Sequence, residues 1–303
     1  MKRIIQFLHP GKEHNATAGS KWNTGAHKRK YLTISGSYIS KKSKNSQRDN
    51  LYFWGEWEAP SKVLKNVNSA NKNFPKNIFS PYYTPESGTV NTDPFVFGKE
   101  FYYFICKQGH YPSLRNIPDG SIILFGSNKN NIFVLDTLFV VKSCDEYDIR
   151  EIETLKYKYN TTFFNVSLKP VANKLEYVDK KEIKKDSCGS CLPSNNDDED
   201  DYKPTKNLHN YKIYRAVMYH EKENFDGMYS FVPCMAGSRG ENGFERPRIV
   251  LPDVISNEQN QGIKNFKTDN IKPFWENIKE QIFNNHQNLD LLVECYYPPL
   301  HKE

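Results

Sequence analysis

The sequence IPDG-SIILFG-SNKNN-IFVLDTLFVVK, residues 117–142, decides the fold class that we predict for this chain. The turn-forming IPDG precedes two apolar runs, residues 121–126 and 132–142, which are separated by a polar run at 127–131. A Pro-Asp-Gly turn followed by an apolar run, a polar turn and a second apolar run is typical of a β-hairpin. Asp136 interrupts the second run, so its side chain either lies on the exposed face of the strand or is held in a site.

Segments on both sides of this hairpin also have the composition of strands. The expected strands are residues 3–8, 31–39, 51–58, 95–107 (one strand or two), 163–168, 211–219, 227–234, 246–251 and 289–297. Of these, 211–219 and 227–234 are expected to pair with each other. Apolar residues at helical spacing predict helices within 145–160 and 270–284, and residues 65–92 predict a long loop. The predicted fold is α+β, with mainly antiparallel strands, a barrel-like core and few peripheral helices.

The predicted domain organisation is simple. The whole chain, residues 1–303, is expected to form a single compact α+β domain. Residues 180–206 differ from the rest because they are acidic and of low complexity, so we expect them to be an exposed insertion.

Residues 114–144 (LRNIPDGSIILFGSNKNNIFVLDTLFVVKSC) resemble the glycine, apolar strand, turn and strand core of PUA-like barrels, including the ASCH and EVE-type readers. In those folds a ligand lies in a cleft lined by aromatic side chains. The resemblance therefore implies a barrel that recognises a nucleotide or a modified base. It supplies no residue-by-residue motif, so no site residue is taken from it.

Basic residues are concentrated at the N-terminal end of the chain. The first fifty residues contain 11 Lys and Arg but 2 Asp and Glu, whereas the whole chain contains 42 and 36. Trp and His residues are interleaved with these cations. A local positive potential attracts anionic partners, so we expect nucleic acid or a phosphate-bearing nucleotide as the partner. A solvated basic face without a ligand is the alternative.

Ten residues are predicted to bind this ligand. Basic side chains would hold phosphate, Trp rings would stack on a base, and Asn side chains, with Glu56, would read the edge of that base. Arg246 follows a glycine-rich turn, residues 237–243, which suits close contact with phosphate. The ten are Lys21, Trp22, Asn23, His27, Lys28, Arg29, Trp54, Trp57, Asn91 and Arg246.

Four residues are predicted to carry acid–base chemistry: Glu56, Glu58, Asp93 and His14. On a strand, Glu56 and Glu58 share one face and repel each other unless basic groups lie opposite. Asp93 precedes a proline, which holds it extended and able to project into a cleft. The alternatives are an ion-paired edge strand for the glutamates and a turn-forming role for Asp93.

No metal site or cofactor is predicted. The pair Cys188 and Cys191 has no second pair with zinc-ligand spacing, and His9 and His14 do not form a standard metal signature. The N-terminal apolar run is too short for a secretory signal, and no apolar run is long enough to span a membrane. We therefore expect a soluble, cytoplasmic protein that has no contact with a membrane.

The sequence thus predicts a nucleic-acid or nucleotide-binding protein, one that could read a modified base. Two alternatives stay open. One is an enzyme acting on a nucleotide or glycosidic substrate, with Glu and Asp residues as acid and base and with Lys21, Arg29 or Arg246 holding the anion. The other is a non-catalytic interaction module that binds another protein through its Tyr- and Phe-rich loops.

Overall fold

The computed structural model describes seven parts of the chain. They are residues 1–14, 28–43, 45–85, 90–174, 209–252, 254–255 and 262–301. Four predicted ligand-binding residues, Lys21, Trp22, Asn23 and His27, and the predicted insertion at 180–206 lie outside the described residues.

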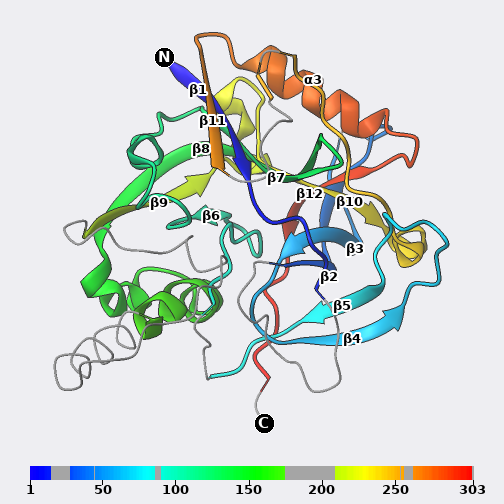
Figure 1. Cartoon of the computed structure of the whole chain (residues 1–303), viewed down its shortest axis with the longest axis horizontal. Coiled ribbons are helices and arrows are strands. Elements are labelled where there is room, and N and C mark those ends of the chain that lie inside the picture. The colour runs from blue at the N-terminus through cyan, green and yellow to red at the C-terminus, as the bar shows by residue number, and fades with distance from the viewer. Residues whose placement is uncertain are drawn as a thin grey trace, which may run out of the picture.

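One sheet contains six strands in the order β11-β1-β7-β8-β9-β6 (Figure 1). Its strands are β1 (Lys2–Leu8), β6 (Tyr102–Tyr103), β7 (Ile122–Lys129), β8 (Ile132–Asp148), β9 (Asn210–Ala216) and β11 (Gly262–Thr268). β1 and β7 are parallel, and the other neighbours are antiparallel. The predicted hairpin is confirmed as β7 and β8. Asn130 and Asn131 join the two strands with φ values of 53° and 59°, which suit a tight turn.

The second sheet has the strand order β12-β10-β3-β2-β5-β4. Its strands are β2 (Arg29–Ile39), β3 (Gln47–Glu56), β4 (Ser61–Asn66), β5 (Asn77–Pro81), β10 (Val232–Ala236) and β12 (Asp290–Cys295). Because β12 also pairs with β2, the strands β2, β3, β10 and β12 close into a four-stranded antiparallel barrel. Gly36 permits this closure, since a Cβ atom there would lie 2.4 Å from the carbonyl oxygen of Glu294.

Helices are few and lie around the sheets (Figure 1). The described helical segments are η1 (Pro112–Arg115), η2 (Ile149–Tyr157), α1 (Thr161–Phe163), η3 (Phe164–Leu168) with the helical residues 169–174 that follow it, η4 (Tyr219–Phe225), η5 (Gly237–Asn242) and α3 (Lys272–Phe283). The helix α3 was predicted from its periodicity. It is anchored by Trp275, whose indole N–H donates to the carbonyl oxygen of Tyr229 at 2.9 Å.

Both faces of β1 are buried, and this places two apolar cores in the molecule. Ile5 and Phe7 belong to one core, while Ile4 and Leu8 belong to the other. Successive side chains of a strand point to opposite faces, so a strand with apolar residues on both faces contributes to both cores. The expected α+β class, with mainly antiparallel strands and a barrel-like core, is confirmed. The likeness to PUA-like barrels stays a prediction.

Several local predictions were wrong. Residues 163–168 are helical because a short apolar run fits either structure, and Asn160 caps the first turn by accepting the N–H of Thr162 at 2.8 Å. β10 pairs with β3 and β12, not with the strand at 211–219. The expected loop at 65–92 contains β5, and β11 was not predicted.

Within the described residues, no helix is long and apolar enough to cross a membrane.

Candidate active site

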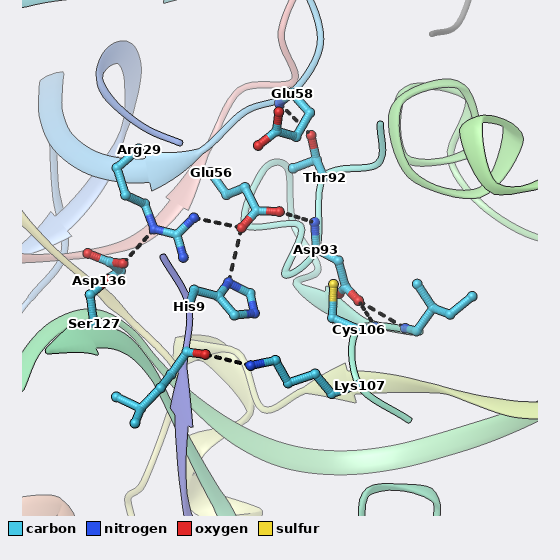
Figure 2. Close-up of polar contacts among 12 residues, drawn as sticks. His9, Arg29, Glu56, Glu58, Thr92, Asp93, Cys106, Lys107, Ser127 and Asp136 are labelled. Atoms are coloured by element: carbon cyan, nitrogen blue, oxygen red, sulfur yellow. Dashed lines mark hydrogen bonds and ion pairs between the residues drawn. The ribbon is translucent and has the colours of Figure 1, made fainter. Parts of the chain in front are cut away.

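A buried group of charged side chains lies where the two sheets meet (Figure 2). We call it the central cluster, and it consists of His9, Arg29, Glu56, Asp93, Asp136 and Arg246. Arg29, Glu56 and Asp136 come from β2, β3 and β8, and the other three come from segments outside the strands, yet each of the six is at most 8% exposed. Charged groups are costly to bury unless they are paired, so the bonds inside this cluster determine what it can do.

Arg29, at the start of β2, is bound by two carboxylates. Its Nε donates to Asp136 Oδ2 and its Nη1 donates to Glu56 Oε2, each at 2.7 Å (Figure 2). Burial opposes the charged form, but the attraction of Asp136 and Glu56 outweighs it and raises the pKa of Arg29. Arg29 is therefore a fixed positive charge.

Strand pairing explains this contact. Arg29 and Glu56 are directly opposite in the β2–β3 ladder, so their side chains are neighbours. Asp136 is the extra residue of a β-bulge in β8, because the pairing passes from Phe125–Thr137 to Gly126–Leu135. Asp136, which interrupts the apolar run 132–142, is therefore held in a site and is not exposed.

Glu56 connects His9 and Asp93 to this ion pair. Its Oε2 lies 3.1 Å from His9 Nδ1, and its Oε1 accepts the backbone N–H of Asp93 at 3.3 Å (Figure 2). Burial lowers the pKa of His9 to about 4, although the hydrogen bond to Glu56 acts in the opposite direction. His9 is therefore neutral at pH 7. A neutral ring that donates from Nδ1 to Glu56 presents Nε2 as a proton acceptor.

Asp93 is held by a turn of the backbone. Its carboxylate accepts the N–H groups of Phe104, Ile105 and Cys106 at 3.1, 2.9 and 2.8 Å. Burial raises the pKa of Asp93 to about 7. The backbone donors of Cys106 and Ile105 oppose that shift, and the charge of Glu56 adds to it. Near neutral pH this carboxyl group can both hold and release a proton.

Arg246 extends the cluster toward the surface. Its Nη1 donates to Ser127 Oγ at 3.1 Å and to Asp136 Oδ1 at 3.3 Å, and its Nη2 donates to the carbonyl oxygen of Gly11 at 2.8 Å. The predicted phosphate clamp is therefore corrected, because this guanidinium is already bound by protein groups. Arg239, in the glycine-rich turn 237–243, forms an ion pair with Asp290.

Lys30 lies on the opposite face of β2 and belongs to a second buried group. We call it the Lys30 cluster, and it consists of Lys30, Glu58, His14 and Phe79. Lys30 Nζ donates to the carbonyl oxygen of Ala59 at 3.1 Å and lies 5.9 Å from the ring centroid of Phe79. Burial lowers the pKa of Lys30 to about 8, against the attraction of Glu58. Burial and the charge of Lys30 lower the pKa of His14 to about 4.

The two glutamates do not share a strand face, so that prediction was wrong. β3 ends at Glu56, and Glu58 lies beyond the end of the strand. The backbone N–H of Glu58 donates to Thr92 Oγ1 at 3.0 Å, on the far side of Glu56 from Arg29 (Figure 2). Strand alternation stops where the ladder stops, so the i, i+2 spacing no longer fixes the relative directions of the side chains.

The predicted stacking residues have other contacts. Trp54 and Trp57 are 5% and 0% exposed, and their indole N–H groups donate to the carbonyl oxygens of Phe244 and Pro60, each at 2.8 Å. Rings that are buried in this way are part of the core and offer no exposed face to a base. The remaining predicted residues, Lys28 and Asn91, are half-buried.

Three residues of this region, His9, Asp136 and Lys107, were not among the predicted site residues, although Asp136 was noted as an interruption of an apolar strand. Lys107 has φ of 61°, lies 5.4 Å from the ring centroid of Phe7 and donates from Nζ to the carbonyl oxygen of Leu8 at 2.8 Å. The sequence signal for His9 was its place at the end of a strand, whereas Lys107 had no such signal.

An open groove of about 340 Å³ lies elsewhere, where β2, β3 and β12 are exposed. Its charged lining residues, Arg48, Asp49 and Glu294, are exposed or half-buried. None of the central cluster residues line this groove. Because the groove holds no buried charged group, the central cluster is the stronger candidate for chemistry.

Among the described residues, no group of three or more His, Cys, Asp and Glu side chains is arranged to hold a metal ion. The chain matches no protein-family model, and no curated protein or solved structure is significantly similar to it. The chemistry of the site therefore has to be inferred from its geometry.

Proposed function

We propose that this protein binds a nucleotide, either free or within a nucleic acid, and acts on it by acid–base catalysis at the central cluster. One observation carries the catalytic part. Glu56 joins a neutral histidine, His9, to the backbone of Asp93, whose pKa is raised to about 7. Pairs of titratable groups whose environments move their pKa values in opposite directions are typical of acid–base sites.

The proposed roles follow from the protonation states. His9 takes a proton from an attacking water molecule, and Glu56 stabilises the imidazolium that forms. Asp93 gives its proton to the leaving group, so one proton is taken and one is given for each bond that is cleaved. Arg29 stays charged throughout and holds Glu56 in position with the second carboxylate, Asp136.

The substrate class rests on charge. The excess of Lys and Arg over Asp and Glu in the first fifty residues favours a phosphate-bearing ligand. Because Trp54 and Trp57 are buried, the proposal does not use their rings for stacking. The burial of these rings argues against a protein that reads a base by stacking it on them. Of the predicted alternatives, it therefore favours the enzyme.

Turnover and binding are tested together on a panel of nucleoside mono-, di- and triphosphates and single- and double-stranded DNA and RNA. Products are detected by mass spectrometry and binding by calorimetry. We compare the wild type, Glu56→Gln and the control Glu294→Gln, whose carboxylate lies on β12 beside the separate groove. We expect Glu56→Gln to lower turnover on the order of 100-fold or more with little change in binding. The reason is that His9 takes the proton, and Glu56 stabilises the imidazolium that His9 then becomes.

Three results decide the proposal. Unchanged turnover in Glu294→Gln together with a large loss in Glu56→Gln supports it. Binding by the wild type without turnover of any panel member overturns the catalytic part and leaves a nucleotide-binding protein. The absence of both binding and turnover overturns the whole proposal.

A further inference from the structure

Polar and basic side chains lead from the central cluster to the surface along one face of the β7–β8 hairpin. Ser127 is paired with Val134 in the ladder, and Val134 forms a bridge to Arg248 on its other side. Residues directly opposite in a ladder point to the same face, so Ser127, Val134 and Arg248 share a face. Lys129 is two residues from Ser127 on the same strand and therefore points to that face too. Arg246 binds both Ser127 and Asp136, so this face is continuous with the cluster.

The segment that follows β1 forms the opposite wall. A Cβ atom on Gly11 would lie 3.0 Å from the Cβ of Ser127 and 3.4 Å from Nη2 of Arg246, so the glycine lets the two walls come close together. Two residues later, Glu13 accepts the backbone N–H of Lys76 at 2.7 Å. This contact brings the residues that precede β5 to the outer end of the row.

Cations outnumber carboxylates at this outer end. Within the described parts of the chain, Lys76, Lys129 and Arg248 form no ion pair. Burial lowers the pKa of Lys129, and the charges of Arg246 and Arg248 lower it further, while Glu245 and Glu13 act against them. Three cations beside two carboxylates, Glu13 and Glu245, leave a net positive charge that attracts anions.

We propose that Lys76, Lys129 and Arg248 bind the phosphate groups of the substrate at the outer end of this row. The inference rests on the proposed function and adds which residues hold the phosphate groups of the substrate. A nucleotide bound at this end has its phosphates outside Ser127 and Arg246, which are 0% and 8% exposed and separate the phosphates from His9 and Glu56. The phosphate groups are then the part by which the substrate is held, and they lie apart from the groups that exchange protons.

Calorimetry with three probes tests this site: pyrophosphate, a nucleoside triphosphate and a short single-stranded oligonucleotide. The test variant is Lys129→Ala/Arg248→Ala. The control is Lys62→Ala/Lys267→Ala, which removes the same charge from exposed positions on β4 and β11. We expect the test variant to lose about tenfold or more in affinity for pyrophosphate, while the control stays within about twofold of the wild type. A loss for pyrophosphate and the triphosphate identifies a free nucleotide as the source of the phosphate, and a loss for pyrophosphate and the oligonucleotide without a loss for the triphosphate identifies nucleic acid.

Equal losses of pyrophosphate affinity in the two double variants would mean that binding depends only on the overall charge of the protein. That result would overturn the site. The absence of pyrophosphate binding by the wild type overturns it as well. The two proposals fail separately. Turnover by the wild type with an unchanged KM in Lys129→Ala/Arg248→Ala removes the phosphate site and leaves the proposed function. Site-specific binding of pyrophosphate without turnover of any nucleotide removes the catalytic proposal and leaves the phosphate site.

Discussion

Arg29 and Lys30 are consecutive buried cations on β2, and they point to opposite faces of the strand. Arg29 has two carboxylate oxygens at 2.7 Å, whereas Lys30 donates to a backbone carbonyl oxygen at 3.1 Å. The pKa of Arg29 is raised, and the pKa of Lys30 is lowered to about 8. Direct pairing, more than the degree of burial, decides whether a buried cation keeps its charge.

This difference separates two kinds of buried polar region. In the central cluster a permanent charge, Arg29, holds Glu56, and Glu56 in turn contacts the two groups that can exchange protons, His9 and Asp93. In the Lys30 cluster, burial moves the cation toward its neutral form. We therefore assign the chemistry to the first region and a structural role to the second.

The largest expected effect comes from removing each cation in turn. Arg29→Met removes the buried cation that binds both Glu56 and Asp136 at 2.7 Å, so we expect the free energy of unfolding to fall by about 3–5 kcal/mol. Lys30→Met removes a group whose charge is already disfavoured, so we expect less than half of that loss. Urea denaturation of both variants at pH 7 measures the difference. Equal losses would show that the two clusters are energetically alike.

The sequence predicts the members of the central cluster better than their arrangement. Arg29, Glu56 and Asp93 were all predicted site residues, and Asp136 was marked because it interrupts an apolar strand. Local patterns could not show that β3 ends at Glu56, so that Glu56 and Glu58 do not share a strand face. They also could not show which strands pair over long sequence distances, such as β12 with β2.

The same limit explains the Trp residues. A Trp beside basic residues has the same composition whether it stacks on a ligand or packs in a core. Only the tertiary structure shows that the carbonyl oxygens of Phe244 and Pro60 accept the indole N–H groups of Trp54 and Trp57. The α+β class was predictable because it depends on local alternation and turns, which the sequence contains directly.

The next largest effect is on the pH dependence of stability. The pKa of Asp93 is raised from 3.8 to about 7, so the folded state keeps a proton that the unfolded state has lost between these values. Its contribution to stability is therefore complete below pH 3.8 and is lost as the pH rises to 7. The pKa of His9 is lowered from 6.5 to about 4, so its contribution is complete above pH 6.5 and is lost as the pH falls to 4.

These opposite slopes cancel in the wild type between about pH 4 and 6.5. In His9→Gln the slope of Asp93 remains, so stability relative to the wild type should fall with rising pH in this window, by at most about 1.4 kcal/mol per pH unit. Asp93→Asn should show the opposite slope. Chemical denaturation at half-unit pH intervals measures both variants. Identical pH profiles for the variants and the wild type would contradict the assigned shifts.

The smallest expected effect is that of Trp54→Phe, at the edge of the central cluster. The ring of Trp54 lies 5.6 Å from the guanidinium of Arg246, and its N–H makes one buried hydrogen bond. Losing that bond should cost about 1 kcal/mol of stability. Nucleotide affinity, measured by calorimetry, should stay within about twofold of the wild type. A loss near 1–3 kcal/mol in binding would return Trp54 to the role of a stacking residue.

The central claim is that the central cluster contains an acid–base pair set by its surroundings. An NMR titration of protein labelled with ¹³C at the Asp carboxyl carbons and ¹⁵N in the His rings tests it most directly, with Asp93→Asn and His9→Gln to assign the signals. The account predicts that the carboxyl group of Asp93 titrates near pH 7 and that the ring of His9 stays neutral down to about pH 4. Titration of Asp93 at or below its ordinary value of 3.8, together with a pKa for His9 near 6.5, would contradict it.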